Sequence, residues 1–136
     1  MILLDTNVLS ELTKPTPSAH VVAWLNNNEP TLALSAVTLA ELRYGIARLP
    51  DGKRKSSLIR FWDMTRDRFK GRTFPFDERT AEIYGDIVAE AEKQGRRLNV
   101  ADAQIAAIAL AHRMSVATRN TGDFENTGVT VINPWT

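Results

Sequence analysis

The sequence predicts a three-layer α/β/α domain with a central parallel sheet. Short apolar segments of strand character alternate along the chain with segments of helical periodicity. Strands that are separated by helices pair in parallel through right-handed crossovers. The first segment, 1–4, is apolar throughout, as is usual for a strand that a parallel sheet buries on both faces. At 136 residues the chain has the length of one domain, so 1–136 is expected to form a single unit.

Local signals set the elements of the first half in order. After the first strand, Ser18 is the expected N-cap of a helix that ends in the polar run 26–28. The segment TLALS (31–35) is the second strand. Ser35 can cap the next helix, whose apolar residues recur at helical spacing until Pro50 stops it.

The second half continues the alternation of helices and strands. It is expected to hold a helix over 57–69, a strand-like segment over 72–76, a helix from the cap Asp77 to Gly95, an apolar helix over 100–113, and strands over 115–118 and 129–132. The apolar helix carries almost no polar face, which predicts burial on most sides.

Composition excludes several classes of protein. The chain has no cysteine, so disulfides, thiolate metal sites and a cysteine nucleophile are excluded. No segment approaches the twenty apolar residues of a membrane span, and the N-terminus lacks the pattern of a signal peptide. A phosphate-binding loop is also absent, because Gly45 and Gly52 are wrongly spaced and follow a helix. We expect a cytoplasmic protein without a membrane partner.

The net charge of +1 hides a strong asymmetry. The segment 43–72 carries ten basic and three acidic residues, a local charge of +7, and the rest of the chain carries −6. Such a segment indicates a surface for a polyanion such as a nucleic acid, with Arg43, Lys53, Arg54 and Lys55 as the candidate binding residues, although a solvated helix face has the same composition.

Polar residues, most of them acidic, follow the ends of the expected strands. Asp5 comes directly after the first strand, where it could shape a turn or hold a metal ion. Glu41 lies in the helix after the second strand. Asn120 and Asp123 follow the strand 115–118. Because parallel neighbours end at the same edge of a sheet, these side chains are expected to lie close together.

Asp102 stands at the head of the apolar helix. Its neighbours at helical spacing are Ile105, Ala106 and Ala109, so its carboxylate is expected to face the interior. A buried charge is costly unless it is paired or bound to a metal. The helix macrodipole would also favour an acid in the first turn, but it does not explain the apolar face.

A cluster of carboxylates without histidine or thiolate partners is a hard oxygen site, which favours Mg²⁺ or Mn²⁺. Such ions activate water and stabilise the leaving oxygen in phosphodiester hydrolysis, which indicates a nuclease. Two alternatives stay open. One is a non-catalytic α/β module that binds nucleic acid or a protein partner through the basic segment. The other is a metal-dependent phosphatase-like domain, although its usual second aspartate is replaced here by Asn7.

Five segments together resemble PIN-domain proteins, and within them the VapC-type toxins of toxin-antitoxin pairs, closest to the FitB branch. They are MILLDTNVLSE, LSAVTLAELRYGIARLPDGK, NVADAQIAA, VATRNTGDF and the terminal NPW. The resemblance implies a PIN-like fold and a Mg²⁺-dependent endoribonuclease that cuts RNA. Its metal-site acids would be Asp5, Glu41 and Asp102, and its supporting residues Thr6, Asn7 and Thr118.

The same resemblance implies partners. It implies a homodimer that is inhibited by a cognate antitoxin, in a heteromeric complex that often binds promoter DNA. One departure concerns the fourth acid, because this chain has Asn120 where many relatives carry a carboxylate. Either Asn120 contacts the ion through a water and takes part in catalysis, or Asp123 supplies the missing charge as a metal ligand.

Overall fold

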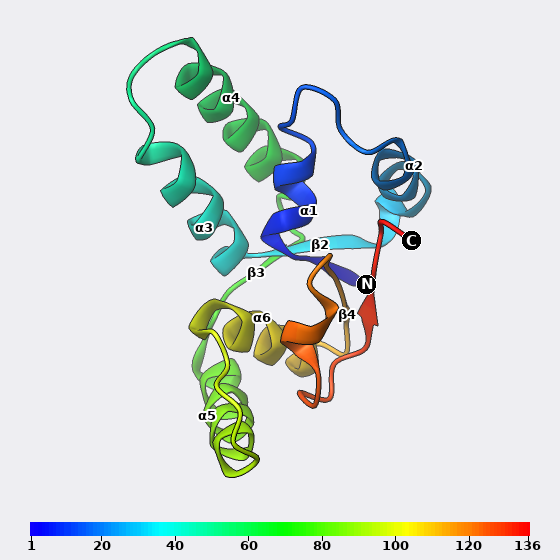
Figure 1. The fold of residues 1–136 in the computed structure, drawn as a ribbon, viewed down its shortest axis with the longest axis vertical. Coiled ribbons are helices and arrows are strands. Elements are labelled where there is room, and N and C mark those ends of the chain that lie inside the picture. Colours follow the sequence, from blue (N-terminus) through cyan, green and yellow to red (C-terminus); the bar gives the residue numbers. More distant parts are fainter.

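Five strands form one parallel sheet in the order β3-β2-β1-β4-β5 in the computed structural model, which describes residues 1–136 (Figure 1). The strands are β1 (Ile2–Leu4), β2 (Leu32–Ser35), β3 (Thr73–Phe74), β4 (Ser115–Ala117) and β5 (Val131–Ile132). In register, Leu3 of β1 lies between Ala33 of β2 and Val116 of β4. The predicted parallel sheet and all five of its strands are therefore confirmed.

Helices cover both faces of this sheet, which makes the three predicted layers (Figure 1). They are α1 (Thr6–Glu11), α2 (Ala19–Asn28), α3 (Ala36–Ala47), α4 (Lys53–Arg68), α5 (Glu78–Lys93) and α6 (Val100–Ala111), with short 3₁₀ turns η1 (Glu29–Thr31) and η2 (Thr121–Phe124). Helices α1 to α4 lie on one side, and α5 and α6 lie on the other. None of the helices combines the length and the apolar character needed to cross a bilayer.

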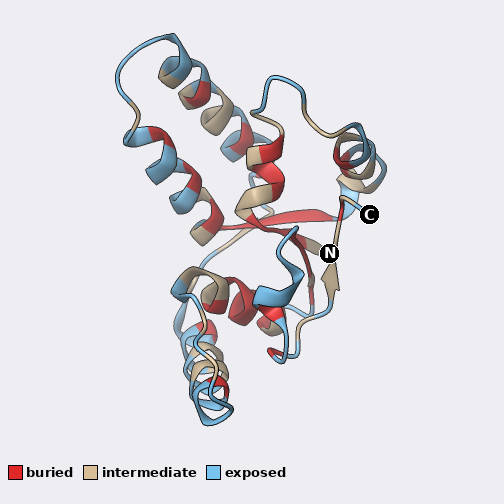
Figure 2. Ribbon diagram, viewed as in Figure 1, coloured by how far each residue is buried: buried red, intermediate tan, exposed pale blue.

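Each face of the sheet has its own hydrophobic core. Leu4 of β1 packs with α1 to α4, whereas its neighbour Leu3 packs with α6. The same alternation separates Ala117 from Val116 in β4, because successive side chains of a strand point to opposite faces. Figure 2 shows the buried residues concentrated on the central strands, on α1 and on α6. Seven of the twelve residues of α6 are buried, as its composition predicts.

Capping residues begin three of the six α-helices where the sequence places them. Ser18 accepts from the N–H of Val21, and Ser35 accepts from the N–H of Thr38. Asp77 forms a capping box with Thr80 at the start of α5. These bonds satisfy backbone donors that have no partner inside the helix.

Two elements differ from the expectation. Helix α1 was not predicted, because its six residues are too few to show a helical repeat before Pro15 and Pro17. Helix α4 begins at Lys53 rather than Ser57, since its first turn is mostly exposed and has no apolar residue to mark it. Lys55 in that turn donates to Ala47 O over 3.1 Å, which ties the start of α4 to the end of α3.

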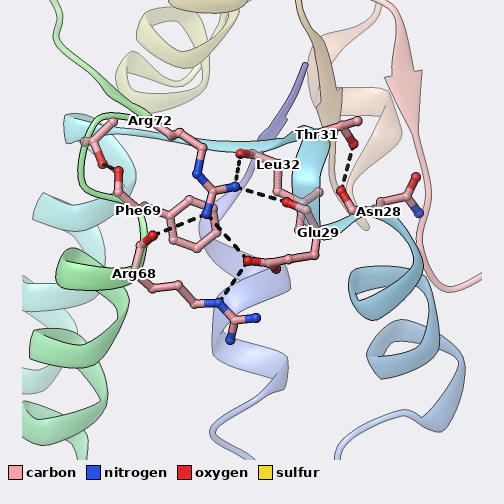
Figure 3. A network of polar contacts seen from close by, with 8 residues as sticks. Asn28, Glu29, Thr31, Leu32, Arg68, Phe69 and Arg72 are labelled. Atoms are coloured by element: carbon pink, nitrogen blue, oxygen red, sulfur yellow. Dashed lines mark hydrogen bonds and ion pairs between the residues drawn. The ribbon is translucent and has the colours of Figure 1, made fainter.

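Arg72 joins the end of α4 to the edge of the sheet (Figure 3). Its Nη1 donates to Glu29 O over 3.0 Å and to Leu32 O over 2.9 Å, and its Nη2 donates to Arg68 O. The Glu29 carboxylate accepts from both Arg68 and Arg72. The arginine fork therefore holds α4, η1 and β2 together beside β3.

Candidate active site

Polar side chains gather in a hollow of about 440 Å³ at the carboxyl ends of β1 and β4. This is the edge at which open parallel sheets bind ligands. The residues that line the hollow are Asp5, Thr6, Asn7, Ser10, Glu11, Lys14, Glu41, Asn99, Asp102, Arg119, Asn120, Asp123 and Trp135. The structure thus brings together all five predicted catalytic or metal-site residues.

Asp5 is buried at the end of β1, and it caps the helix that follows. Its Oδ1 accepts from the N–H of Thr6 over 2.8 Å, so it caps α1. Its Oδ2 accepts from Thr118 Oγ1, also over 2.8 Å. Burial raises the pKa of Asp5, as do the charges of Glu41 and Asp123, whereas the bonds from Thr118 and Thr6 lower it.

Asn7 connects Asp5 to the end of β4. Its Nδ2 contacts both Thr118 Oγ1, at 3.1 Å, and Asp5 Oδ2, at 3.4 Å. Its Oδ1 accepts from the N–H of Arg119 over 3.2 Å. The supporting roles predicted for Asn7 and Thr118 therefore have a physical basis, because these side chains fix the orientation of the Asp5 carboxylate.

Glu41 projects from α3 into the same hollow, and it is exposed. Its Oε1 accepts from Thr6 Oγ1 over 2.6 Å. Thr6 therefore holds Glu41 with its hydroxyl while its backbone N–H binds Asp5. This pair of contacts couples the start of α1 to α3.

Asp102 lies in the first turn of α6, above the fully buried residues Ile105, Ala106 and Ala109. Burial, together with the smaller effects of the charges of Asp5, Asp123 and Glu41, raises the pKa of its carboxyl to about 7. Its backbone N–H donates to Asn99 Oδ1, so Asn99 caps the helix that carries it. No basic side chain forms an ion pair with Asp102.

Two residues, Asn120 and Asp123, are candidates for the fourth member of the predicted metal site. The N–H of Asn120 donates to Thr118 Oγ1 over 3.1 Å, which fixes its backbone beside Asp5. Asp123 lies in η2 and raises the pKa values of both Asp5 and Asp102. Asp123 therefore lies near both acids and adds a fourth carboxylate to the three of Asp5, Glu41 and Asp102.

The donor chemistry of the hollow fits a hard cation. The charges of Glu41 and Asp123 raise the pKa values of both Asp5 and Asp102, and a cation would remove that repulsion. No three acidic side chains lie close enough together to ligate one ion directly. This spacing is compatible with Mg²⁺, which keeps several waters and is held by one or two carboxylates.

One side of the hollow carries residues that the sequence did not single out. Glu11 is buried and pairs with Lys14 over 2.8 Å, and its other oxygen accepts from the N–H of Ser18. These bonds lower the pKa of Glu11, as does the charge of Arg119 to a smaller extent. The guanidinium of Arg119 lies 5.3 Å from the centroid of the Trp135 ring. Its position directly after Thr118, a predicted supporting residue, is the sequence signal that could have placed Arg119 at the site.

The predicted RNA-binding residues lie elsewhere. Arg43 rests on the ring of Trp62, Arg54 donates to Thr13 O, and Lys55 pairs with Asp51. Lys53 is exposed at the start of α4. None of these four residues lines the hollow, so any contact they make with RNA would lie outside it.

Comparison with known proteins gives consistent matches. The model of the PIN domain family matches residues 2–129. The chain is 45% identical to VapC ribonuclease Y4jK of Sinorhizobium fredii, covering 99% of this chain and 98% of that protein. It is 47% identical to toxin FitB of Neisseria gonorrhoeae, with 99% of each covered. A solved structure of FitAB bound to a DNA fragment superimposes with a TM-score of 0.93 at 46% identity, covering 100% of this chain and 96% of that chain.

Proposed function

Since the chain belongs to the PIN-domain family, in the group of VapC and FitB toxins, we propose that it is a Mg²⁺-dependent endoribonuclease. It acts as the toxin of a toxin-antitoxin pair. The observation that carries this proposal is the convergence of Asp5, Glu41, Asp102 and Asp123 in one hollow, where each raises the pKa of a neighbour or has its own raised.

Asp5 and Asp102 would hold the ion, with Glu41 and Asp123 beside them; Mn²⁺ has the same ligand preference. A bound ion of this kind supplies a water activated for attack on phosphorus and a positive charge at the leaving oxygen. Thr118 and Asn7 hold the Asp5 carboxylate in place, and Thr6 Oγ1 holds Glu41. Asp102 loses its proton when it becomes a ligand, since a metal binds the carboxylate form.

The proposal includes protein partners. A cognate antitoxin inhibits the protein, the toxin forms a homodimer, and the heteromeric complex binds promoter DNA. The similarity to FitAB bound to a DNA fragment, at 46% identity over the whole chain, supports this part.

Cleavage of single-stranded or looped RNA by the purified protein tests the proposal. We expect cleavage with Mg²⁺ or Mn²⁺, loss of cleavage with excess EDTA, and strong reduction in Asp5→Asn and Asp102→Asn. Asp86→Asn, an exposed aspartate of α5, is the matched control and should cut at the parent rate. Sequencing the cleavage ends after brief induction in cells identifies the RNA.

Four results would contradict the proposal. Cleavage that persists in EDTA, or that survives both substitutions, would remove the metal from the mechanism. RNA binding without cleavage under any metal condition would favour a non-catalytic module, and hydrolysis of phosphomonoesters alone would favour a phosphatase-like domain.

A further inference from the structure

We propose that Arg119 and Lys14 bind an RNA phosphate adjacent to the one that is cut, on the side of the hollow beside Trp135. This inference rests on the proposed function, because it names the residues that hold the substrate of the same site. It assigns part of RNA binding to residues outside the basic segment 43–72.

Arg119 is held directly beside the acid cluster. It follows Thr118, whose hydroxyl binds Asp5, and its own N–H donates to Asn7 Oδ1 over 3.2 Å. Asn7 in turn contacts Asp5. The backbone of Arg119 is therefore fixed relative to the carboxylate that would hold the ion.

The side chain of Arg119 is positioned but has no acidic partner. Its guanidinium lies 5.3 Å from the centroid of the Trp135 ring, and the backbone N–H of Trp135 donates to Asn133 Oδ1 over 2.9 Å. Arg119 forms no ion pair, although acidic residues line the same hollow. Its N–H donors are thus available to a ligand, and a guanidinium matches the geometry of a phosphate.

Lys14 adds a second cation on this side. It pairs with Glu11, a carboxylate that is only 5% exposed and that also accepts from the N–H of Ser18. Glu11 therefore fixes the place of the ammonium, while the Lys14 side chain itself remains 53% exposed. An ammonium has three donors, so Lys14 can bind a phosphate oxygen without leaving Glu11.

The distribution of charge explains why RNA would need these residues. Asp5, Glu41, Asp102 and Asp123 make their side of the hollow strongly negative, and a single divalent ion would offset only part of that charge. A phosphodiester chain entering the hollow would be repelled there. Arg119 and Lys14 are the two basic residues that line it, so they provide the attraction that positions the chain.

RNA binding in an inactive background tests the proposal without relying on cleavage. The Asp5→Asn full-length protein is titrated with a labelled single-stranded RNA at several salt concentrations. Adding Arg119→Gln, or Lys14→Gln, should raise the Kd about tenfold. The slope of log Kd against log salt concentration should fall by about one, as expected for the loss of one phosphate contact. Arg119→Lys should keep the salt slope, because it keeps the charge. Arg79→Gln, an exposed arginine of α5, is the control and should change neither quantity.

Kinetics of the otherwise unchanged protein give a second readout. Arg119→Gln should raise KM while kcat stays within about twofold of the parent, since the residue binds substrate away from the reacting atoms. An unchanged Kd, salt slope and KM in both variants would overturn the proposal, as would an absence of RNA binding by the parent. If the parent binds RNA with these dependences and cuts none, the proposed nuclease fails and the phosphate site stands.

Discussion

Thr118 Oγ1 donates to Asp5 Oδ2 over 2.8 Å, which joins the carboxyl ends of β4 and β1. The two residues are 113 positions apart in the chain. The bond lowers the pKa of Asp5 against the larger effect of burial. Thr118 therefore helps to keep Asp5 ionised.

Replacing Thr118 with valine should raise the pKa of Asp5 further, because the hydroxyl donor is lost while the shape is kept. We expect the acid limb of the cleavage profile to move to higher pH and the free energy of unfolding to fall by about 1–2 kcal/mol. Thr65→Val is the control, since the Thr65 hydroxyl bonds only within α4, to Phe61 O. Equal pH profiles for the two variants would contradict the role assigned to Thr118.

The pKa of Asp102 predicts how stability depends on pH without a metal. Burial and three neighbouring acids raise it from 3.8 to about 7 in the folded state. The folded protein thus binds a proton more tightly than the unfolded chain, so this contribution is present below pH 3.8 and is lost as pH rises through about 7. Urea unfolding in EDTA should show stability falling from pH 5 to pH 8, with a smaller fall in Asp102→Asn.

Mg²⁺ should reverse that trend, because a cation favours the ionised carboxylates. Its stabilising effect should be greater at pH 8 than at pH 5 in the parent and small in Asp102→Asn. Asp86→Asn should behave as the parent does. A fall in stability that Asp102→Asn leaves unchanged would assign the dependence to other groups.

Metal binding distinguishes Asn120 from Asp123. An asparagine is neutral and adds little affinity for a second cation. We expect one tight Mg²⁺ site built on Asp5 and Asp102, and a second ion that binds weakly until RNA phosphate completes its shell. Asp123→Asn should reduce cleavage less than Asp5→Asn does. Calorimetry that finds two equally tight ions, one of them lost in Asp123→Asn, would make Asp123 a full ligand.

The basic start of α4 should contribute to RNA affinity from outside the hollow. Reversing Lys53, Arg54 and Lys55 together to glutamate should flatten the dependence of RNA binding on salt, since each phosphate contact releases counterions. Thermal unfolding of the variant controls for the lost contacts of Arg54 and Lys55. If the variant is folded and its salt slope is unchanged, these residues serve solubility or the antitoxin instead.

Arg72 should matter for stability and not for chemistry. Arg72→Met removes the donors to Glu29 O, Leu32 O and Arg68 O that Figure 3 shows, and we expect a loss of about 2–4 kcal/mol in the free energy of unfolding. Arg68→Met, which removes a more exposed partner of Glu29, should cost less than about 1 kcal/mol. Similar losses in the two variants, measured by urea unfolding, would contradict the role assigned to the Arg72 guanidinium.

Patterns within short segments were enough to predict much of the fold. The caps Ser18, Ser35 and Asp77 begin their helices as expected, because a capping bond joins residues only three apart. The apolar residues after Asp102 predicted the buried face of α6 for a similar reason, since a helix repeats every 3.6 residues. Helix α1 was missed because it is too short to show that repeat.

The sequence by itself determined the alternation of strands and helices, the parallel sheet and the acids at its carboxyl edge, because each depends on local spacing and on the common direction of parallel strands. Only the tertiary structure decided that Thr118 and Asn7 bind Asp5, and that Arg119 and Lys14 enter the hollow while residues 53–55 do not. Those relationships join segments far apart in the chain. Their geometry follows from how the sheet order brings β1 beside β4, which no local pattern encodes.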